Sequence, residues 1–421
     1  MGEYKVFMRK KIFFLLFFTV LSTAVQAQFW QSFNSILGTD ESLQPVKTKV
    51  LIHPLLEGAL LDVKGSYKIY NPMDGSCWAS RLFKKSRFIQ PTQGGLRWGE
   101  EFPGVYQLAF VPEDNQTTIL VNGIEYKGSV YVYQIGDDQI SIVNELDIED
   151  FIKSTLSLQV TAPMEPEALA SLAIVARTDA YYQRLQQKGK FWYQTAEQSN
   201  YKGYAVTFAG NGVERAVDDT KYLVMRDIVQ SQYFPARWTK DSGGKTASYL
   251  NIFRRAAPGP NAGVEAPFAL VNRQNTAWDL EISTNELASI FNLQDIDTVE
   301  VFKDPETHRV YGLRIRHNHG QKELDFASFQ KAIGKRRGQD RLLSNDFQVK
   351  LEGNQVRFNG FGIGHGVGLC IYSAEQMAKQ EQNASRILAD FFPGTSVEMA
   401  AKELPSSNEV SVREQEGVYW R

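Results

Sequence analysis

The sequence of 421 residues contains little cysteine, little net charge and no long apolar run after its N-terminus. Two cysteines, Cys77 and Cys370, exclude a disulfide scaffold and a cysteine-rich zinc site, and leave one bridge between them open. The 46 basic and 48 acidic side chains leave a net charge of −2, which gives no electrostatic reason to expect nucleic acid as a partner. With 43% apolar residues, the chain can bury a large core.

The N-terminus carries the pattern of a secretory signal peptide. Basic residues at 9–11 precede an apolar stretch at 12–20, and V-Q-A at 25–27 provides small residues for cleavage after Ala27. We therefore expect export to the periplasm or cell envelope, with no integral membrane segment after processing. A membrane anchor is the alternative, but the apolar stretch is shorter than the ~20 residues that a spanning helix needs.

The rest of the chain predicts an α+β fold. After a polar lead-in at 28–45, alternating apolar residues separated by turn residues predict a β-rich region at 46–143. A core that contains helices is expected at 144–400, and residues 401–421 form a polar tail.

Capping signals place three helices in this core. Pro166 suits the first turn of a long helix, and Gly189 suits the stop after it. Ser373 followed by Gln376 predicts the start of a second helix through a capping box. Asn383 predicts the N-cap of a third, short helix that a Pro-Gly pair ends.

Five glycines alternate through the segment G-F-G-I-G-H-G-V-G at 360–368, around His365. Glycine inside a strand is costly, so such a run indicates that a ligand or another backbone comes close, or that φ is positive. We expect an extended segment with one bare face and with His365 on the other, in a groove floored by backbone. The alternative is a strand packed tightly against a helix, with a histidine of the core. The spacing fits neither a dinucleotide fingerprint nor a phosphate loop.

Three further motifs carry weaker signals. His317 and His319 could form a metal pair, but a hairpin turn explains them better because no third ligand is nearby. Ser242 precedes two glycines, and a glycine turn is expected because no activating base is nearby. Arg177 follows a small, apolar helix face, where a partly buried arginine requires a carboxylate or an anion.

Five stretches, in the same order, resemble the stage II sporulation protein D / LytB amidase-enhancer family. They are ISIVNELDIEDFIKSTLSLQV, EALASLAIVARTDAYY, SGGKT, RLLSNDFQV and GFGIGHGVGLCIYSAEQMAKQ with ILADFFPGT. The second is similar to an E-A-L start that leads to A-A-R-T-Y-A, the third to an S-G-G-x-T turn, and the last to a G-H-G-V-G-M-S-Q-x-G-A block followed by Y-P-G-T. The resemblance covers about 50–395. It implies a core with a glycan groove, no cofactor or metal, and work on peptidoglycan glycan strands, in LytB-type members with a cell-wall amidase.

The resemblance also implies a set of site residues. The family's catalytic glutamate lies eight residues before the glutamate of E-A-L, which is Glu167 here, so that position is Gln159. Glutamine cannot deliver the proton that glycosidic cleavage needs, and the acid would have to come from elsewhere, with Glu165 and Glu197 as candidates. The other site residues that the resemblance implies are Arg177, His365, Gly362, Gly364, Gly366, Gly368 and Tyr372.

Two functions remain open from the sequence. One is a lytic transglycosylase that cuts peptide-free glycan strands with a rearranged acid. The other is a catalytically weakened glycan-binding protein that presents peptidoglycan to an amidase or acts as a recruiting scaffold. Both use the same substrate. A glutamate at 159 would have decided for the enzyme, and Gln159 leaves both functions open.

Overall fold

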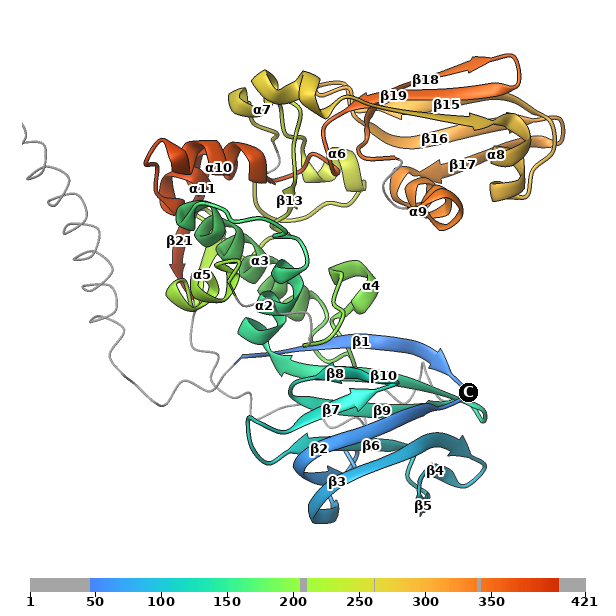
Figure 1. Ribbon diagram of the computed structural model, residues 1–421, viewed down its shortest axis with the longest axis vertical. Helices are drawn as coiled ribbons and strands as arrows, with labels where there is room; N and C mark the ends of the chain where they lie inside the picture. The colour runs from blue at the N-terminus through green and yellow to red at the C-terminus, as the bar shows by residue number, and fades with distance from the viewer. Residues whose placement is uncertain (1–45, 205–209, 261, 339–341, 401–421) are drawn as a thin grey trace, which may run out of the picture. The chain divides into compact units, whose positions relative to one another are not determined.

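The computed structural model describes residues 46–204, 210–260, 262–338 and 342–400 (Figure 1). The chain divides into residues 1–45 and 46–421, so all described residues belong to the second unit. The predicted signal peptide, the lead-in at 28–45 and the tail at 401–421 lie outside the described residues. None of the helices within the described ranges is both long and apolar enough to cross a membrane.

The predicted β-rich region folds into strands of one sheet (Figure 1). The strands of this sheet are β1 (Lys47–Leu56), β2 (Ala59–Tyr70), β3 (Cys77–Thr92), β4 (Gly95–Trp98), β5 (Glu100–Pro103), β6 (Gln107–Pro112), β7 (Thr118–Val121), β8 (Ile124–Tyr126), β9 (Ser129–Ile135), β10 (Gln139–Asp147) and, from outside the predicted region, β11 (Gln194–Thr195). The order of neighbours is β11-β1-β10-β9-β6-β2-β3-β4-β5, and β7 pairs with β2 and β8.

The interior of this sheet follows from the alternation in the sequence. Along β2, the side chains of Ala59, Leu61 and Val63 are buried while their neighbours are not, as expected for a strand with one face on a core. Trp98 is also buried and meets Phe110 edge-to-face, with ring centroids 4.9 Å apart. Aromatic side chains therefore form part of this core.

The pattern changes to helix at the end of β10. The helices that follow are α2 (Ile148–Ser157), α3 (Pro166–Gln186), α4 (Ala196–Ser199), α5 (Val213–Asp219), α6 (Tyr249–Phe253), α7 (Pro267–Asn272), the 3₁₀ helix η1 (Arg273–Thr276), α8 (Thr284–Phe291), α9 (Phe326–Arg337), α10 (Ile371–Lys379) and α11 (Ala384–Phe391). The long helix starts at Pro166 and ends before Gly189, as predicted. It is buried from Ala168 to Tyr181, and most residues of this stretch are small or apolar, with Arg177 and Asp179 as its charged members. The α+β class is confirmed.

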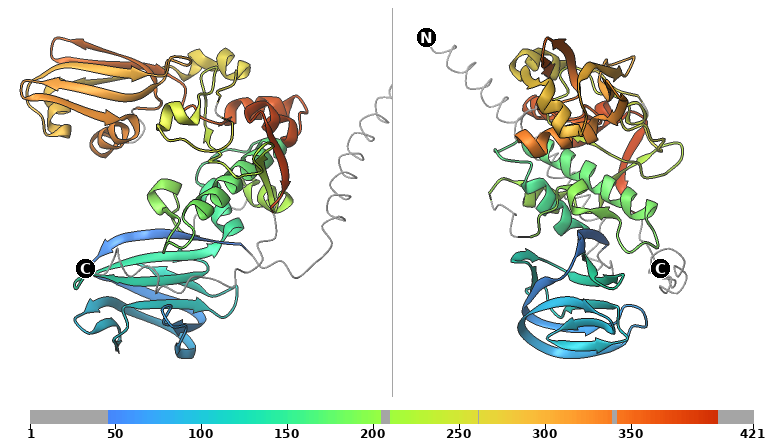
Figure 2. Two further views of the ribbon diagram at one scale, coloured as in Figure 1. Left: turned by 180° about the vertical axis from the view of Figure 1, so that it is seen from behind. Right: turned by 90° about the vertical axis from the view of Figure 1, so that its right-hand side faces the viewer.

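Two three-stranded sheets and two helices share a second core (Figure 2). The strands are β14 (Trp278–Ser283), β18 (Asp346–Glu352) and β19 (Gln355–Phe361) in one sheet, and β15 (Ile296–Lys303), β16 (Val310–His317) and β17 (Gly320–Asp325) in the other. Phe329 of α9 packs between Phe291 and Phe358 in this core. His317 pairs with Gly320 across the turn from β16 to β17, so the predicted hairpin is confirmed.

Short strand pairs connect the helices to the glycine segment. β12 (Leu223–Asp227) pairs with β21 (Thr395–Met399), and β13 (Trp238–Thr239) pairs in parallel with β20 (Leu369–Cys370).

The second predicted helix begins earlier than its capping signal indicated. α10 starts directly after β20, at Ile371, so the prediction that Ser373 caps it is wrong. The strand pair carries the chain into the helix, and Ser373 lies in the first turn with a buried hydroxyl that lacks a partner. The cap of α11 is confirmed, because the Asn383 side chain accepts a 2.9 Å hydrogen bond from the Arg386 N–H.

Candidate functional site

The glycine segment at 360–368 is not the extended strand that its alternation predicted. Gly362, Gly364, Gly366 and Gly368 have φ values of +77°, +101°, +72° and +79°, so every second residue from 362 lies in the region that favours glycine. The segment therefore bends at alternate residues, and the prediction of one bare, extended face is wrong.

The chain itself fills the space beside these glycines. A Cβ on Gly362 would lie 2.8 Å from the carbonyl oxygen of Asp241, and one on Gly368 would overlap the carbonyl group of Arg237. A Cβ on Gly364 would likewise overlap the Thr239 hydroxyl. Of the reasons that the sequence offered for the glycines, positive φ and close approach of another backbone both apply.

The β13–β20 pair brings two parts of the predicted site together. Trp238 pairs with Leu369, at the end of the glycine segment, and its Nε1–H donates a 2.5 Å hydrogen bond to Oε1 of Gln159. Both side chains are partly exposed. Gln159 directly follows the C-cap of α2, where the chain turns towards α3. The glutamine at the family's acid position is therefore held beside the strand that follows the glycine segment.

His365 is neutral in this environment. Its Nδ1 accepts a 3.1 Å hydrogen bond from the Val367 N–H, and its ring meets Phe253 edge-on at 5.2 Å between centroids. Loss of solvation, and then the positive charges of Arg237 and Arg309, lower the pKa of His365 to about 3. Because Nδ1 accepts, the proton of the neutral ring is on Nε2. His365 can therefore donate a hydrogen bond at neutral pH, but it cannot serve as a general acid there.

A carboxylate that sequence reasoning missed pairs with a neighbour of Trp238. Asp179 Oδ2 lies 2.9 Å from Nη1 of Arg237, and Asp179 is buried in α3. Burial raises the pKa of Asp179, although Arg237 and Gln183 act in the opposite direction. The available signal was the departure from the motif, because Asp179 stands where A-A-R-T-Y-A has its tyrosine.

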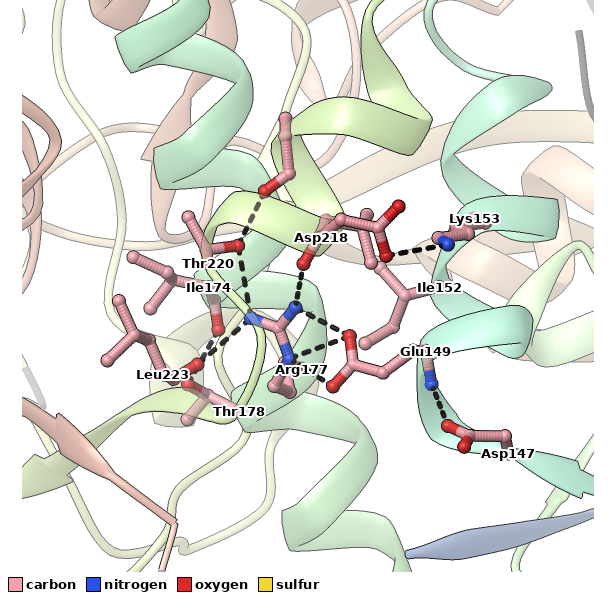
Figure 3. Close-up of polar contacts among 12 residues, drawn as sticks. Asp147, Glu149, Ile152, Lys153, Ile174, Arg177, Thr178, Asp218, Thr220 and Leu223 are labelled. Carbon is pink, nitrogen blue, oxygen red and sulfur yellow. Dashed lines mark hydrogen bonds and ion pairs between the residues drawn. The ribbon is translucent and has the colours of Figure 1, made fainter. Parts of the chain in front are cut away.

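Arg177 lies in the interior (Figure 3). Its Nε and Nη2 donate to the two carboxylate oxygens of Glu149 at 2.8 Å and 2.7 Å. The guanidinium also donates to the carbonyl oxygens of Val217 and Leu223 at 3.1 Å and 3.0 Å. The carboxylate that the sequence required is thus Glu149. Arg177 joins α3 to α2, α5 and β12, and it is fully buried, away from any ligand at the surface.

The candidate acid Glu165 lies at the start of α3, near Glu167, and its carboxylate makes no capping hydrogen bond. Glu165 is the N-cap residue, and its backbone N–H donates a 2.9 Å hydrogen bond to the Glu375 side chain. Glu167 accepts a 2.7 Å hydrogen bond from the first N–H of α11. These two bonds fasten the starts of α3 and α11 to carboxylates.

Glu197 lies on α4 and is exposed, with Lys331 Nζ 2.6 Å from its carboxylate. The hydrogen bond from Lys331 lowers the pKa of Glu197, which keeps the carboxylate ionised. It is therefore poorly suited to donate a proton.

Cys77 and Cys370 are free thiols, the first exposed and the second buried. The Cys370 sulfur accepts a 3.3 Å hydrogen bond from the Ser242 N–H, which ties the S-G-G turn to β20. The backbone N–H of Tyr372 donates a hydrogen bond to the carbonyl oxygen of Lys240. The side chain of Tyr372 is partly exposed. Within the described ranges, no three His, Cys, Asp or Glu side chains form a group that could hold a metal ion.

Comparisons with known proteins agree with the resemblance. The model of a family described as SpoIID, stage II sporulation protein, matches residues 136–226, which include Gln159 and Arg177. An uncharacterized protein of Brachyspira hyodysenteriae is 30% identical over 345 residues, which are 80% of this chain and 89% of that protein. Uncharacterized proteins of Chlamydia muridarum and Chlamydia pneumoniae are each 35% identical, over 52% and 46% of this chain and 73% and 70% of their own lengths. The chain therefore belongs to the stage II sporulation protein D (SpoIID) family, a family related to the cell wall.

Proposed function

We propose that this protein is exported, binds the glycan strands of peptidoglycan and takes part in remodelling cell-wall glycan. The observation that carries the proposal is the pair of Gln159 and Trp238. An indole that is partly exposed offers an apolar face on which a sugar ring can pack. The Gln159 amide and the His365 Nε2–H add neutral hydrogen-bonding groups beside the β13–β20 pair. Neutral polar groups around an aromatic face suit a carbohydrate.

The same residues favour binding over fast cleavage. Cleavage requires an acid that delivers a proton to the glycosidic oxygen, and the Gln159 amide can hydrogen-bond to that oxygen but cannot protonate it. His365 is neutral near pH 7 and has no additional proton to give. A bound but intact strand could then be presented to a cell-wall amidase, as the resemblance to amidase enhancers suggests.

The test compares binding and cleavage in one set of variants. We expect wild-type protein to sediment with purified sacculi, and Trp238→Ala to lose that binding while remaining folded. Gln159→Glu should increase the release of anhydro-muropeptides from peptide-free strands by about 10²–10⁴-fold, the usual effect of one acid–base group. Gln159→Asn is the matched control, because it keeps an amide. A folded Trp238→Ala protein that binds like wild type would contradict the proposal.

A second candidate function is a lytic transglycosylase with a relocated acid, and Asp179 is the observation that favours it. A carboxyl group with a raised pKa could protonate the glycosidic oxygen as the C1–O bond breaks. The 6-hydroxyl of the muramic residue would then close onto C1 and return its proton to the carboxylate. Wild-type turnover that Asp179→Asn or Glu165→Gln abolishes would favour this function. Glu197→Gln is the control, since the Glu197 carboxylate is exposed and paired with Lys331.

A further inference from the structure

A cleft of about 700 Å³ lies beside the S-G-G-K-T turn. Its walls come from residues 242–245 of that turn, from Leu270 and Arg273, from the connection between β15 and β16, and from β18 and β19. Neither Gln159 nor His365 lines it. The cleft is therefore distinct from the surface around Trp238.

The charges of the cleft do not balance. Two of its basic side chains are paired with acids: Lys245 with Glu265 at 3.3 Å, and Arg273 with Asp346 at 2.6 Å. Two more line the cleft, Lys303 and Arg309, and neither forms an ion pair with any described residue. Two positive charges therefore remain without a direct counter-charge.

The Arg309 side chain donates its hydrogen bonds to neutral groups, and the carboxylates of Asp346 and Asp241 act on its charge through space without forming an ion pair with it. Its side chain is buried, with Nη1 donating to Oδ1 of Asn345 at 2.8 Å and Nη2 donating to the carbonyl oxygen of Ser242. Gly366 packs against the guanidinium so closely that a Cβ there would overlap it. A buried charge is costly unless it is paired, so this arrangement favours an anion in the cleft.

Two unpartnered polar groups accompany Arg309. The Ser242 hydroxyl and the Asn345 amide nitrogen are buried and have no hydrogen-bond partner. Ser242 also lines the cleft. Hydroxyl and amide N–H groups beside a guanidinium are the donors that oxyanion sites use.

We propose that this cleft binds an oxyanion, a carboxylate or a phosphate group, with Arg309 and Lys303 as its counter-charges and Ser242 as a hydrogen-bond donor. This site goes beyond the proposed glycan surface. The charge of Arg309 also affects the proposed glycan surface, because Arg309 is one of the two cations that lower the pKa of His365. Binding of an anion is therefore expected to raise the pKa of His365.

Titration calorimetry of the full chain with inorganic phosphate and with N-acetylmuramic acid tests the proposal, and neutral N-acetylglucosamine is the reference ligand. We expect Lys303→Gln to weaken anion binding about fivefold and Arg309→Gln about 30-fold or more. Lys68→Gln is the matched control, because Lys68 lies on β2, does not line the cleft and is paired with Glu113 at 3.1 Å, and it should change binding less than twofold.

Binding of either anion that Lys303→Gln weakens and Lys68→Gln does not would support the site. Binding of both anions would indicate a general oxyanion site, and binding of N-acetylmuramic acid alone would indicate a site for the carboxylate of a sugar. No binding up to about 10 mM, or equal binding by wild type and both charge variants, would overturn it. Sacculus binding lost in Trp238→Ala but kept in Lys303→Gln would separate this proposal from the proposed glycan surface.

Discussion

Two buried arginines among the described residues differ in the groups that they contact. Arg177 is 0% exposed and donates two hydrogen bonds to the carboxylate of Glu149. Arg309 is 1% exposed and donates to an amide and a carbonyl group, with no carboxylate in contact. The arginine of the family motif is thus internally satisfied, whereas the arginine outside the motifs is not. The contrast indicates that Arg177 stabilises the fold and that Arg309 belongs to a binding site.

The largest expected effect comes from breaking the satisfied pair. Arg177→Met or Glu149→Gln leaves a buried group without its partner, and we expect either to lower the free energy of unfolding by about 3–5 kcal/mol. Urea unfolding followed by circular dichroism measures it. The double variant Arg177→Met/Glu149→Leu should recover much of the loss, because it removes both charges. Single variants within about 1 kcal/mol of wild type would contradict the assignment.

Gly366 tests how tightly Arg309 is enclosed. Gly366→Ala places a Cβ against the guanidinium at a φ of +72°, and we expect a loss of about 2–4 kcal/mol from strain and overpacking together. Gly353→Ala is the control, since Gly353 also has a positive φ, +59°, but no atom lies within 4 Å of its added Cβ. Equal losses in the two variants would show that Arg309 moves freely.

Replacing the unpaired arginine should cost less than replacing the paired one. Arg309→Met leaves the Ser242 carbonyl and the Asn345 amide without their donor, for which we expect about 1–3 kcal/mol in urea unfolding. Inorganic phosphate should stabilise wild type and leave Arg309→Met unchanged, since a ligand stabilises only the state that binds it. A loss as large as that of Arg177→Met would mean that the two arginines have the same role.

Near neutral pH the smallest expected effect is that of His365, which is uncharged there in the folded chain and largely uncharged in the unfolded chain. Its folded pKa, about 3, lies below its ordinary value, 6.5, so the unfolded chain binds more protons between these two pH values. Stability is therefore expected to fall as pH decreases from 6.5 towards 3, and less so in His365→Gln. Because Arg309 is one cause of the shift, Arg309→Met should raise the pKa of His365 in an NMR titration. Arg314→Gln is the control, since Arg314 pairs with Glu300 and Glu323, and a comparable rise there would argue against a specific effect.

Local signals predicted much of the fold. The start of α3 at Pro166, the Asn383 cap and the turn at His317 each depend on residues within one turn of the chain. Ser373 failed as a cap because a distant strand, β13, pairs with β20 and carries the chain directly into α10. The pairing of β13 with β20, and not the local capping signal, therefore sets the start of α10.

The site was less predictable because its contacts are long-range. The sequence required a carboxylate or anion for Arg177, but it could not identify Glu149. Alternating glycines have the period of a strand, and that period cannot distinguish a bare face from alternate positive φ values. Arg309 follows a turn in a β-hairpin, without a local signal, and its partners Ser242 and Asn345 lie far from it in the sequence.

The position of β1 in the sheet affects how fast this region can fold. β1 pairs antiparallel with β10, where Lys47 faces Asp147, and parallel with β11, where Val50 faces Gln194. Closing such long loops costs entropy before any contact forms, so folding slows as sequence separation grows. During synthesis, β1 cannot pair until β10 and β11 have been made. The hairpin of β18 and β19 can form as soon as both strands have been made. Until β10 and β11 are made, the backbone groups of β1 lack strand partners, which exposes β1 to wrong pairing.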